Sequence, residues 1–169
     1  RQQMKNVFLS LIFIVTLSGC YTTGTNSPSS SWNYPWPQNM DKNQFISKYF
    51  AGKTLDPVEG VYIGSNNKYE IAVIKNTFGI SSGYDYLGIL TDENAAYWSV
   101  GEVKLRLKKT ATSTLLTGDF YMGDRGRVGR TFIFKDGYFE VSLPTGYYGA
   151  SQKWMYIKTY PDKKTASAK

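Results

Sequence analysis

The 169-residue sequence contains no histidine and a single cysteine. The absence of histidine removes the commonest general base of enzymes, the Ser-His-Asp triad, the Cys-His dyad and the ligands of most zinc sites. One cysteine excludes a disulfide framework. The length suits one domain of roughly 100–150 residues with further segments attached. Aromatic residues make up 16% of the chain and glycine contributes 16 residues, a balance that favours strands and turns.

The first twenty residues have the pattern of an export signal. Lys5 precedes an apolar run of 11 residues, Val7–Leu17. A membrane-spanning helix needs about 20, so the pattern predicts a secretory signal peptide over residues 1–19. The segment Leu17-Ser18-Gly19-Cys20 matches the lipobox, and in this feature the chain resembles bacterial lipoproteins. The alternative is an ordinary signal peptide with an incidental cysteine.

The lipoprotein resemblance implies that residues 1–19 are removed and that Cys20 becomes an acylated N-terminus, anchored by covalent lipid such as palmitate. Asp after the lipidated cysteine is the usual signal for retention in the inner membrane, but here the residue is Tyr21. In a cell envelope with two membranes, the resemblance therefore implies the outer membrane. Export also argues against nucleic acid as a partner, despite the net charge of +7.

Residues 20–39 are predicted to form a flexible tether, because no charged residue lies between Tyr21 and Asn39. Within it, Trp32, Tyr34 and Trp36 alternate beside prolines. They either pack on their own domain or lie at lipid headgroups.

A short helix is predicted over residues 42–51. Asp41 and Gln44 have the spacing of a capping box, and Gly52 follows as a terminating glycine. Phe45 and Tyr49 belong to an apolar face at helical spacing, which we expect to cover the end of a sheet.

From residue 59 onward the hydrophobic period changes from 3.6 to 2, which predicts strands. Val103, Leu105 and Leu107 alternate with a basic stripe of Lys104, Arg106 and Lys108 that we expect to face solvent. Asp136-Gly137 predicts a type I′ hairpin turn. The expected strands span 59–64, 68–75, 84–91, 101–110, 115–122, 127–135, 138–143 and 153–160.

Eight strands joined by short turns predict an all-β fold: a single antiparallel eight-stranded meander, closed into a small barrel over residues 40–160. Residues 161–169 form a polar tail that we expect to be disordered. The segment Glu59-Gly60-Val61-Tyr62 opens the meander after a short helix, as in lipocalin-like (calycin) barrels, which the domain resembles. Tyr62 stands where that family has Trp, and Arg130 is the candidate for the late arginine that packs on it. The resemblance implies a ligand cavity in the barrel mouth.

Two segments are candidates for contact with a ligand or partner. Arg125, Arg127 and Arg130 lie within six residues among glycines, a composition suited to phosphate or carboxylate groups. Tyr147 and Tyr148 are flanked by glycines on a loop, and such aromatics often contact proteins or sugars. A solvated turn and a loop folded over the barrel mouth are the respective alternatives.

Nothing in the sequence selects a catalytic pair among the carboxylates of Glu59, Glu70, Asp85, Glu102 and Asp119. We therefore predict a non-enzymatic binding domain with no catalytic residue, no metal site and no cofactor apart from the lipid on Cys20. The expected ligand is small and apolar or amphipathic. The alternative is an envelope protein–protein interaction module, an assembly accessory or enzyme inhibitor, with a filled barrel core.

Overall fold

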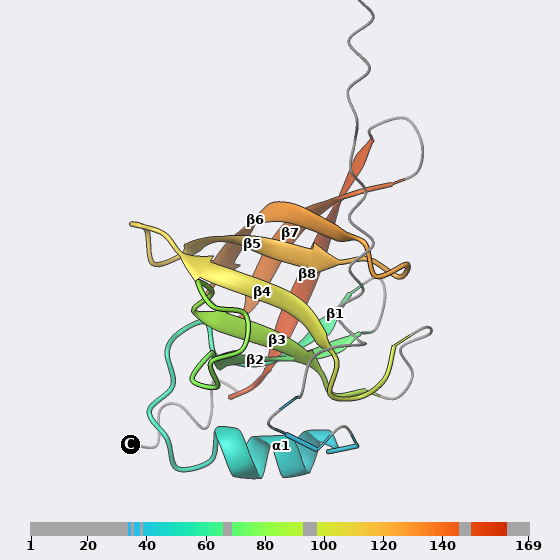
Figure 1. The fold of residues 1–169 in the computed structure, drawn as a ribbon. Helices are drawn as coiled ribbons and strands as arrows, with labels where there is room; N and C mark the ends of the chain where they lie inside the picture. Colours follow the sequence, from blue (N-terminus) through green and yellow to red (C-terminus); the bar gives the residue numbers. More distant parts are fainter. Residues whose placement is uncertain are drawn as a thin grey trace, which may run out of the picture.

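The computed structural model describes residues 34, 36–37, 39–65, 69–92, 98–145 and 150–161. Within these ranges one short helix precedes eight strands, which form a closed antiparallel barrel of sequence neighbours (Figure 1). The predicted fold class is therefore confirmed. The elements are α1 (Lys42–Tyr49), β1 (Gly60–Gly64), β2 (Glu70–Lys75), β3 (Tyr86–Leu90), β4 (Val103–Lys109), β5 (Leu115–Tyr121), β6 (Arg127–Lys135), β7 (Tyr138–Pro144) and β8 (Ser151–Tyr160).

The barrel interior is filled by aromatic and aliphatic side chains. Phe139 of β7 stacks on Tyr156 of β8 with ring centroids 4.7 Å apart, and Phe134 stacks on Phe139 at 4.9 Å. Tyr62 meets Phe139 edge to face at 5.1 Å. An eight-stranded barrel is just wide enough for such packing. The interior of this barrel is accordingly a solid core, not an open channel.

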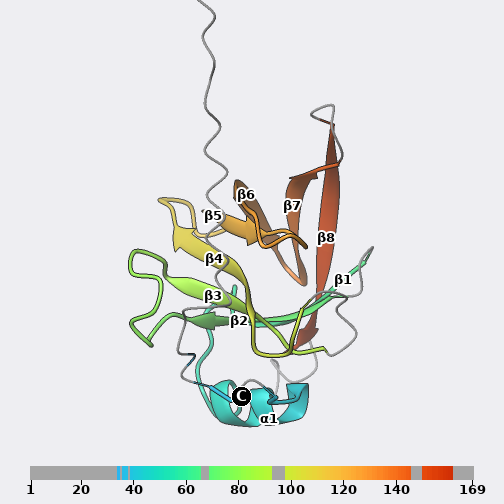
Figure 2. The ribbon, with the colours of Figure 1, turned by 45° about the vertical axis from the view of Figure 1, so that its right-hand side comes forward.

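A second core lies outside the barrel, between α1 and the outer face of β1–β3 (Figure 2). The capping box is confirmed: Asp41 accepts a hydrogen bond from the Gln44 backbone at 2.9 Å, and Gln44 accepts one from the Asp41 backbone at 3.1 Å. We expected α1 to cover the end of the sheet, but it covers a face, because β2 and β3 are apolar on both sides. The side chains that form this core from the strands are Val61, Ala72, Ile74, Leu87, Ile89 and Val103.

Trp36 joins the N-terminal segment to the second core. Its side chain is buried, and its indole N–H donates to the Gly101 carbonyl at 2.8 Å. Phe78 contacts its ring edge-on, and Tyr34 packs beside it. Of the two predicted positions for these aromatics, Tyr34 and Trp36 take the one against their own domain. All residues of both cores lie between Tyr34 and Tyr160, so a chain that starts at Tyr21 retains both cores.

Strand β1 meets β8 at a point where only glycine fits. Gly60 has a φ of 149°, and a Cβ there would lie 2.1 Å from the Tyr160 carbonyl oxygen. Two positions along, the Tyr62 hydroxyl donates to the Val58 carbonyl at 3.0 Å, and Lys158 Nζ lies 5.5 Å from the centre of its ring. These contacts tie the start of β1 to the end of β8.

Two local predictions are wrong. Lys104 does not face solvent: a β-bulge places it between the Val103 and Leu105 pairs with β3, and it turns into the barrel with 1% of its surface exposed. Arg106 and Lys108 do project outward. The 136–137 turn connects β6 to β7 as predicted, but Gly137 has a positive φ and Asp136 does not, whereas a type I′ turn needs both.

Gly118 provides a test of the β4–β5 register. It pairs with Leu107, and a Cβ at this position would lie 1.9 Å from the Arg106 carbonyl oxygen. We expect Gly118→Ala to lower the free energy of unfolding by about 2–3 kcal/mol, measured by urea denaturation. Gly123→Ala is the matched control, because no atom lies within 4 Å of a Cβ there. Equal stability of the two variants would contradict this register.

Candidate functional site

A cavity of about 630 Å³ opens at one end of the barrel, called here the cavity end. Loops 110–114 and 136–137 and the segment before β1 surround it. Its floor consists of side chains from the barrel core, which also close it off from the opposite end. The apolar members of this floor are Val58, Tyr86, Leu116 and Phe134.

The rim of the cavity is polar and rich in lysine. Lys109, Lys135 and Lys158 line it together with Asp56 and Asp136, and the 110–114 loop adds hydroxyl groups. Lys109 Nζ lies 3.6 Å from the Asp56 carboxylate, and Lys158 Nζ donates to the Pro57 carbonyl at 2.8 Å. Three ammonium groups against two carboxylates give the rim a positive balance. An apolar floor below a basic rim suits an amphipathic anion.

Asp56 and Tyr86 fix the inner edge of this rim. The Tyr86 hydroxyl donates to the Asp56 carboxylate at 2.7 Å, and this bond lowers the pKa of Asp56. Burial, followed by the same bond, raises the pKa of Tyr86. Asp56 is therefore ionised and Tyr86 neutral at physiological pH. Burial also lowers the pKa of Lys158.

The opposite end of the barrel, the Trp98 end, contains a buried ammonium group among aromatic rings. Lys104 Nζ lies 4.0 Å from the centre of the Trp98 ring, 4.8 Å from that of Tyr69 and 4.9 Å from that of Phe120. Burial, with a smaller contribution from the nearby charge of Arg125, lowers the pKa of Lys104 to about 7. Contact with the aromatic rings favours the charged ammonium group, but the loss of its hydration on burial disfavours it more, so the pKa is lowered.

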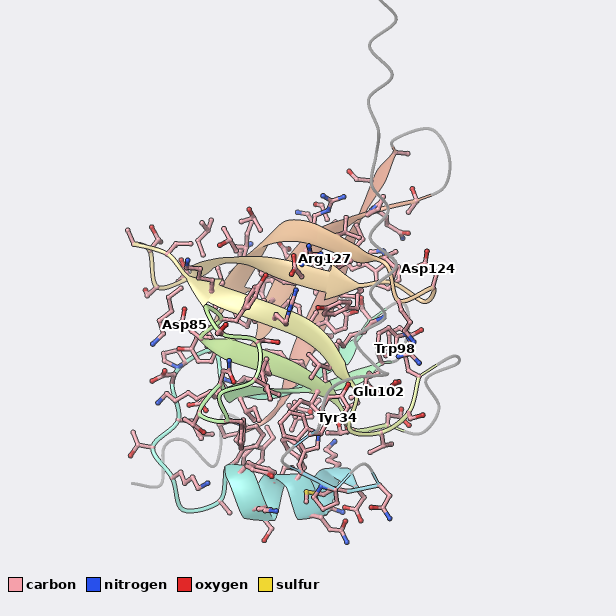
Figure 3. All side chains as sticks on the ribbon, viewed as in Figure 1. Tyr34, Asp85, Trp98, Glu102, Asp124 and Arg127 are labelled. Atoms are coloured by element: carbon pink, nitrogen blue, oxygen red, sulfur yellow. The ribbon has the colours of Figure 1, made fainter. Side chains whose placement is uncertain are left out.

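Arg125 covers the same indole. Its guanidinium carbon lies 3.9 Å from the centre of the Trp98 ring, and its Nη1 is 2.7 Å from the Glu102 carboxylate. Arg125 itself has a left-handed φ of 67° at the tip of the β5–β6 hairpin. Figure 3 shows Trp98, Glu102 and Asp124 gathered at this end, with Asp85 at the other.

The three arginines of the predicted anion site have different partners within the protein. Arg125 is paired with Glu102, as described. Arg127 lies 3.9 Å from Asp119, and Arg130 donates to the Gly129 carbonyl at 2.9 Å. Arg130 lines a shallow groove on the outer wall and is not the cation over Tyr62, which is Lys158. The other candidate residues, Tyr147, Tyr148 and Cys20, lie outside the described residues.

The five carboxylates considered for catalysis are also held separately. Glu70 pairs with Lys42, and Glu102 with Arg125. The other three are bound as follows: Asp119 to Arg106, Asp85 to the Lys109 backbone N–H, and Glu59 to the Asp56 and Lys75 backbones. Across the described ranges, no three metal-ligating side chains are grouped to hold an ion.

Comparison with protein-family models, curated proteins and solved structures finds no match to this chain. No helix in the part of the chain that the structure describes is both long and apolar enough to cross a bilayer.

The resemblance to lipocalin-like barrels implies a cavity in the barrel mouth, but sequence reasoning missed the segments that line it and the buried lysine. The cavity is formed by three segments far apart in the chain, and no local pattern connects them. A signal for Lys104 existed in Gly101 and Glu102, which interrupt the alternation just before β4. Such an interruption is typical of a bulge, but only the pairing with β3 determines which residue turns inward.

The pKa of Lys104 predicts a specific pH dependence of stability. Between pH 7 and 10.5 the unfolded chain binds a proton that the folded protein releases, so the free energy of unfolding rises with pH in this window. We expect a slope of about 1 kcal/mol per pH unit between pH 7 and 9. Lys104→Met, which keeps the length of the side chain without the charge, should lose this slope. If the free energy of unfolding, measured by urea denaturation, rises equally with pH in the wild type and in Lys104→Met, the assignment to Lys104 is contradicted.

Proposed function

We propose that this protein is a lipid-anchored protein of the bacterial cell envelope whose barrel binds a small amphipathic ligand at the cavity end. The observation that carries this proposal is the cavity of about 630 Å³ with its apolar floor and lysine-rich rim. Ligand pockets typically enclose roughly 300–1,000 Å³ and combine apolar walls with a few polar groups. The ligand would place an apolar part on Phe134 and Leu116 and an anionic group near Lys109 or Lys135.

The contacts at Tyr62 support the resemblance to lipocalin-like barrels. The resemblance implies an aromatic residue near the start of the first strand with a cation from late in the chain packed on it. Here Tyr62 and Lys158 have that relation, so that Tyr replaces Trp and Lys replaces Arg. The packed interior limits a ligand to the cavity at the end of the barrel, and the resemblance implies a cavity in the barrel mouth.

The packed interior favours a second candidate function. A filled core leaves the outer wall and the loops as the binding surfaces, as in an envelope protein–protein interaction module. Native mass spectrometry of the chain from residue 21, purified without detergent, separates the two. A co-purifying mass that extracts into organic solvent supports ligand binding, and a ligand-free mass together with a co-purified protein supports the module.

Filling the cavity should weaken ligand binding. Ala111 lines the cavity on an exposed loop, so Ala111→Trp adds a ring there without disturbing the core. We expect wild-type protein to bind anilinonaphthalene sulfonate, dodecanoate to displace it, and the variant to bind it roughly tenfold or more weakly. Binding is measured by fluorescence titration.

Ala51→Trp is the control for this experiment. Ala51 is exposed after α1 and does not line the cavity. Its substitution should leave the affinity for the dye unchanged. If both tryptophan variants bind the dye as the wild type does, the cavity is not the binding site.

The lipid anchor is tested by metabolic labelling with palmitate in a bacterial host. We expect the wild-type chain to incorporate label, and Cys20→Ala to incorporate none and to keep residues 1–19, because cleavage follows lipidation of the cysteine. Ser18→Ala keeps a small residue in the lipobox and should be labelled as the wild type is. An unlabelled wild-type chain would refute the anchor.

A further inference from the structure

One part of the outer barrel wall is apolar and uncovered. Of the residues that the structure describes, the large hydrophobic side chains that are exposed are Ile63, Ile133 and Ile157, with 36%, 40% and 46% of their surfaces accessible. Their neighbours Phe132, Phe134 and Tyr156 point into the barrel. Because side chains alternate along a strand, the isoleucines point outward.

The strand register places these side chains on one surface. Ile63 of β1 pairs with Ile157 of β8, which pairs with Tyr138 of β7. Two residues further along β7, Glu140 pairs with Ile133 of β6 on one side and with Met155 of β8 on the other. We call this surface, formed by Ile63, Ile133, Tyr138, Met155 and Ile157, the isoleucine face. Figure 2 shows β6 and β7 on the side of the barrel away from α1.

Two lysines flank the isoleucine face. Lys135 Nζ lies 3.5 Å and Lys153 Nζ 3.6 Å from the Glu140 carboxylate, which is buried between them. The lysine side chains are 47% and 64% exposed, so their ammonium groups remain accessible at the surface. The two charges exceed that of the single carboxylate, and the face is therefore apolar with a basic border.

We propose that the isoleucine face rests on an anionic lipid bilayer. A stable protein–protein interface needs roughly 800 Å² and 20–30 residues from each partner, far more than this face provides. A bilayer surface needs less, because a few inserted apolar side chains act together with the attraction of lysines to anionic headgroups. The face has both components, and the chain from Tyr21 onward contains 18 Lys and Arg against 13 Asp and Glu, because Arg1 and Lys5 alone of the 20 basic residues precede it.

Docking of the isoleucine face also determines where the cavity lies relative to the bilayer, because Lys135 is next to both. Lys135 borders the isoleucine face and also lines the cavity at the end of β6. With the face on a bilayer, the cavity therefore opens beside the lipid headgroups. The docking itself does not depend on whether the cavity binds a ligand.

Fluorescence labelling of single cysteines tests the contact directly. A chain that starts at Tyr21 retains both cores and contains no cysteine, so Ile157→Cys or Ser47→Cys introduces the only thiol. Ser47 is exposed on α1, on the side of the barrel away from β6 and β7. With a nitrobenzoxadiazole label and vesicles of phosphatidylglycerol and phosphatidylcholine, we expect a blue shift of emission at position 157 and none at 47.

A pair of lysine variants tests the electrostatic part. Lys153→Ala should weaken binding to the anionic vesicles about fivefold in co-sedimentation. Lys108→Ala, which removes an exposed lysine from another part of the wall, should bind as the wild type does. Raised salt should weaken the binding of all three proteins.

Three results would overturn the proposal. The first is no association of the Tyr21–Lys169 chain with anionic vesicles at low salt. The second is equal loss of binding in Lys153→Ala and Lys108→Ala, which would reflect net charge alone. The third is a concentration-dependent dimer in solution that Ile157→Thr abolishes, which would assign the face to a second copy of the chain. Thr is β-branched, so this variant retains strand propensity.

Discussion

Closure of the sheet between β1 and β8 is the constraint on which the rest of the molecule depends. Until the last strand pairs with the first, neither the interior aromatic stack nor the cavity end is complete, and both edges of the sheet remain open to other chains. Gly60 makes the closure sterically feasible, because the Tyr160 carbonyl occupies the place of a side chain. Tyr62 and Lys158 then hold the two ends of the chain's sheet together. The pairing is also the most distant in sequence, so it forms at the greatest entropic cost.

Closure divides the surfaces of the molecule by chemistry. The interior is solid, the wall of β1–β3 is buried under α1, and the wall of β6–β8 is open with aliphatic side chains. The cavity end and the Trp98 end differ in the same way: one leaves lysines around an accessible hollow, whereas the other encloses a lysine among rings. The proposed binding function is therefore limited to the ends and the outer wall, because no space remains along the barrel axis.

Local sequence patterns were sufficient to predict the helix and the strands, but insufficient to predict which side chains these elements enclose. The box of Asp41 and Gln44 and the alternation of apolar residues through β5–β7 depend on neighbours a few residues away, so strand bounds were predicted to within two residues. The inward turn of Lys104 depends on its pairing with β3, and the docking of α1 on a face depends on strands buried on both sides. That last signal was visible, since Ala72 and Ile74 are apolar and alternate with the equally apolar Ile71 and Val73. The segments that line the cavity had no such signal, because they lie far apart in the chain.

The packing of Trp36 determines how the folded domain bears a pull on its N-terminal end. Tension on the chain before Tyr34 reaches the indole, its bond to the Gly101 carbonyl and then α1 before it reaches β1. These contacts join the N-terminal segment and α1 to the outer face of β1–β3, and tension acts on them one after another. The strands of the barrel are instead held by ladders of backbone hydrogen bonds. Under tension we therefore expect the second core to separate from the sheet first, while the closed barrel remains folded.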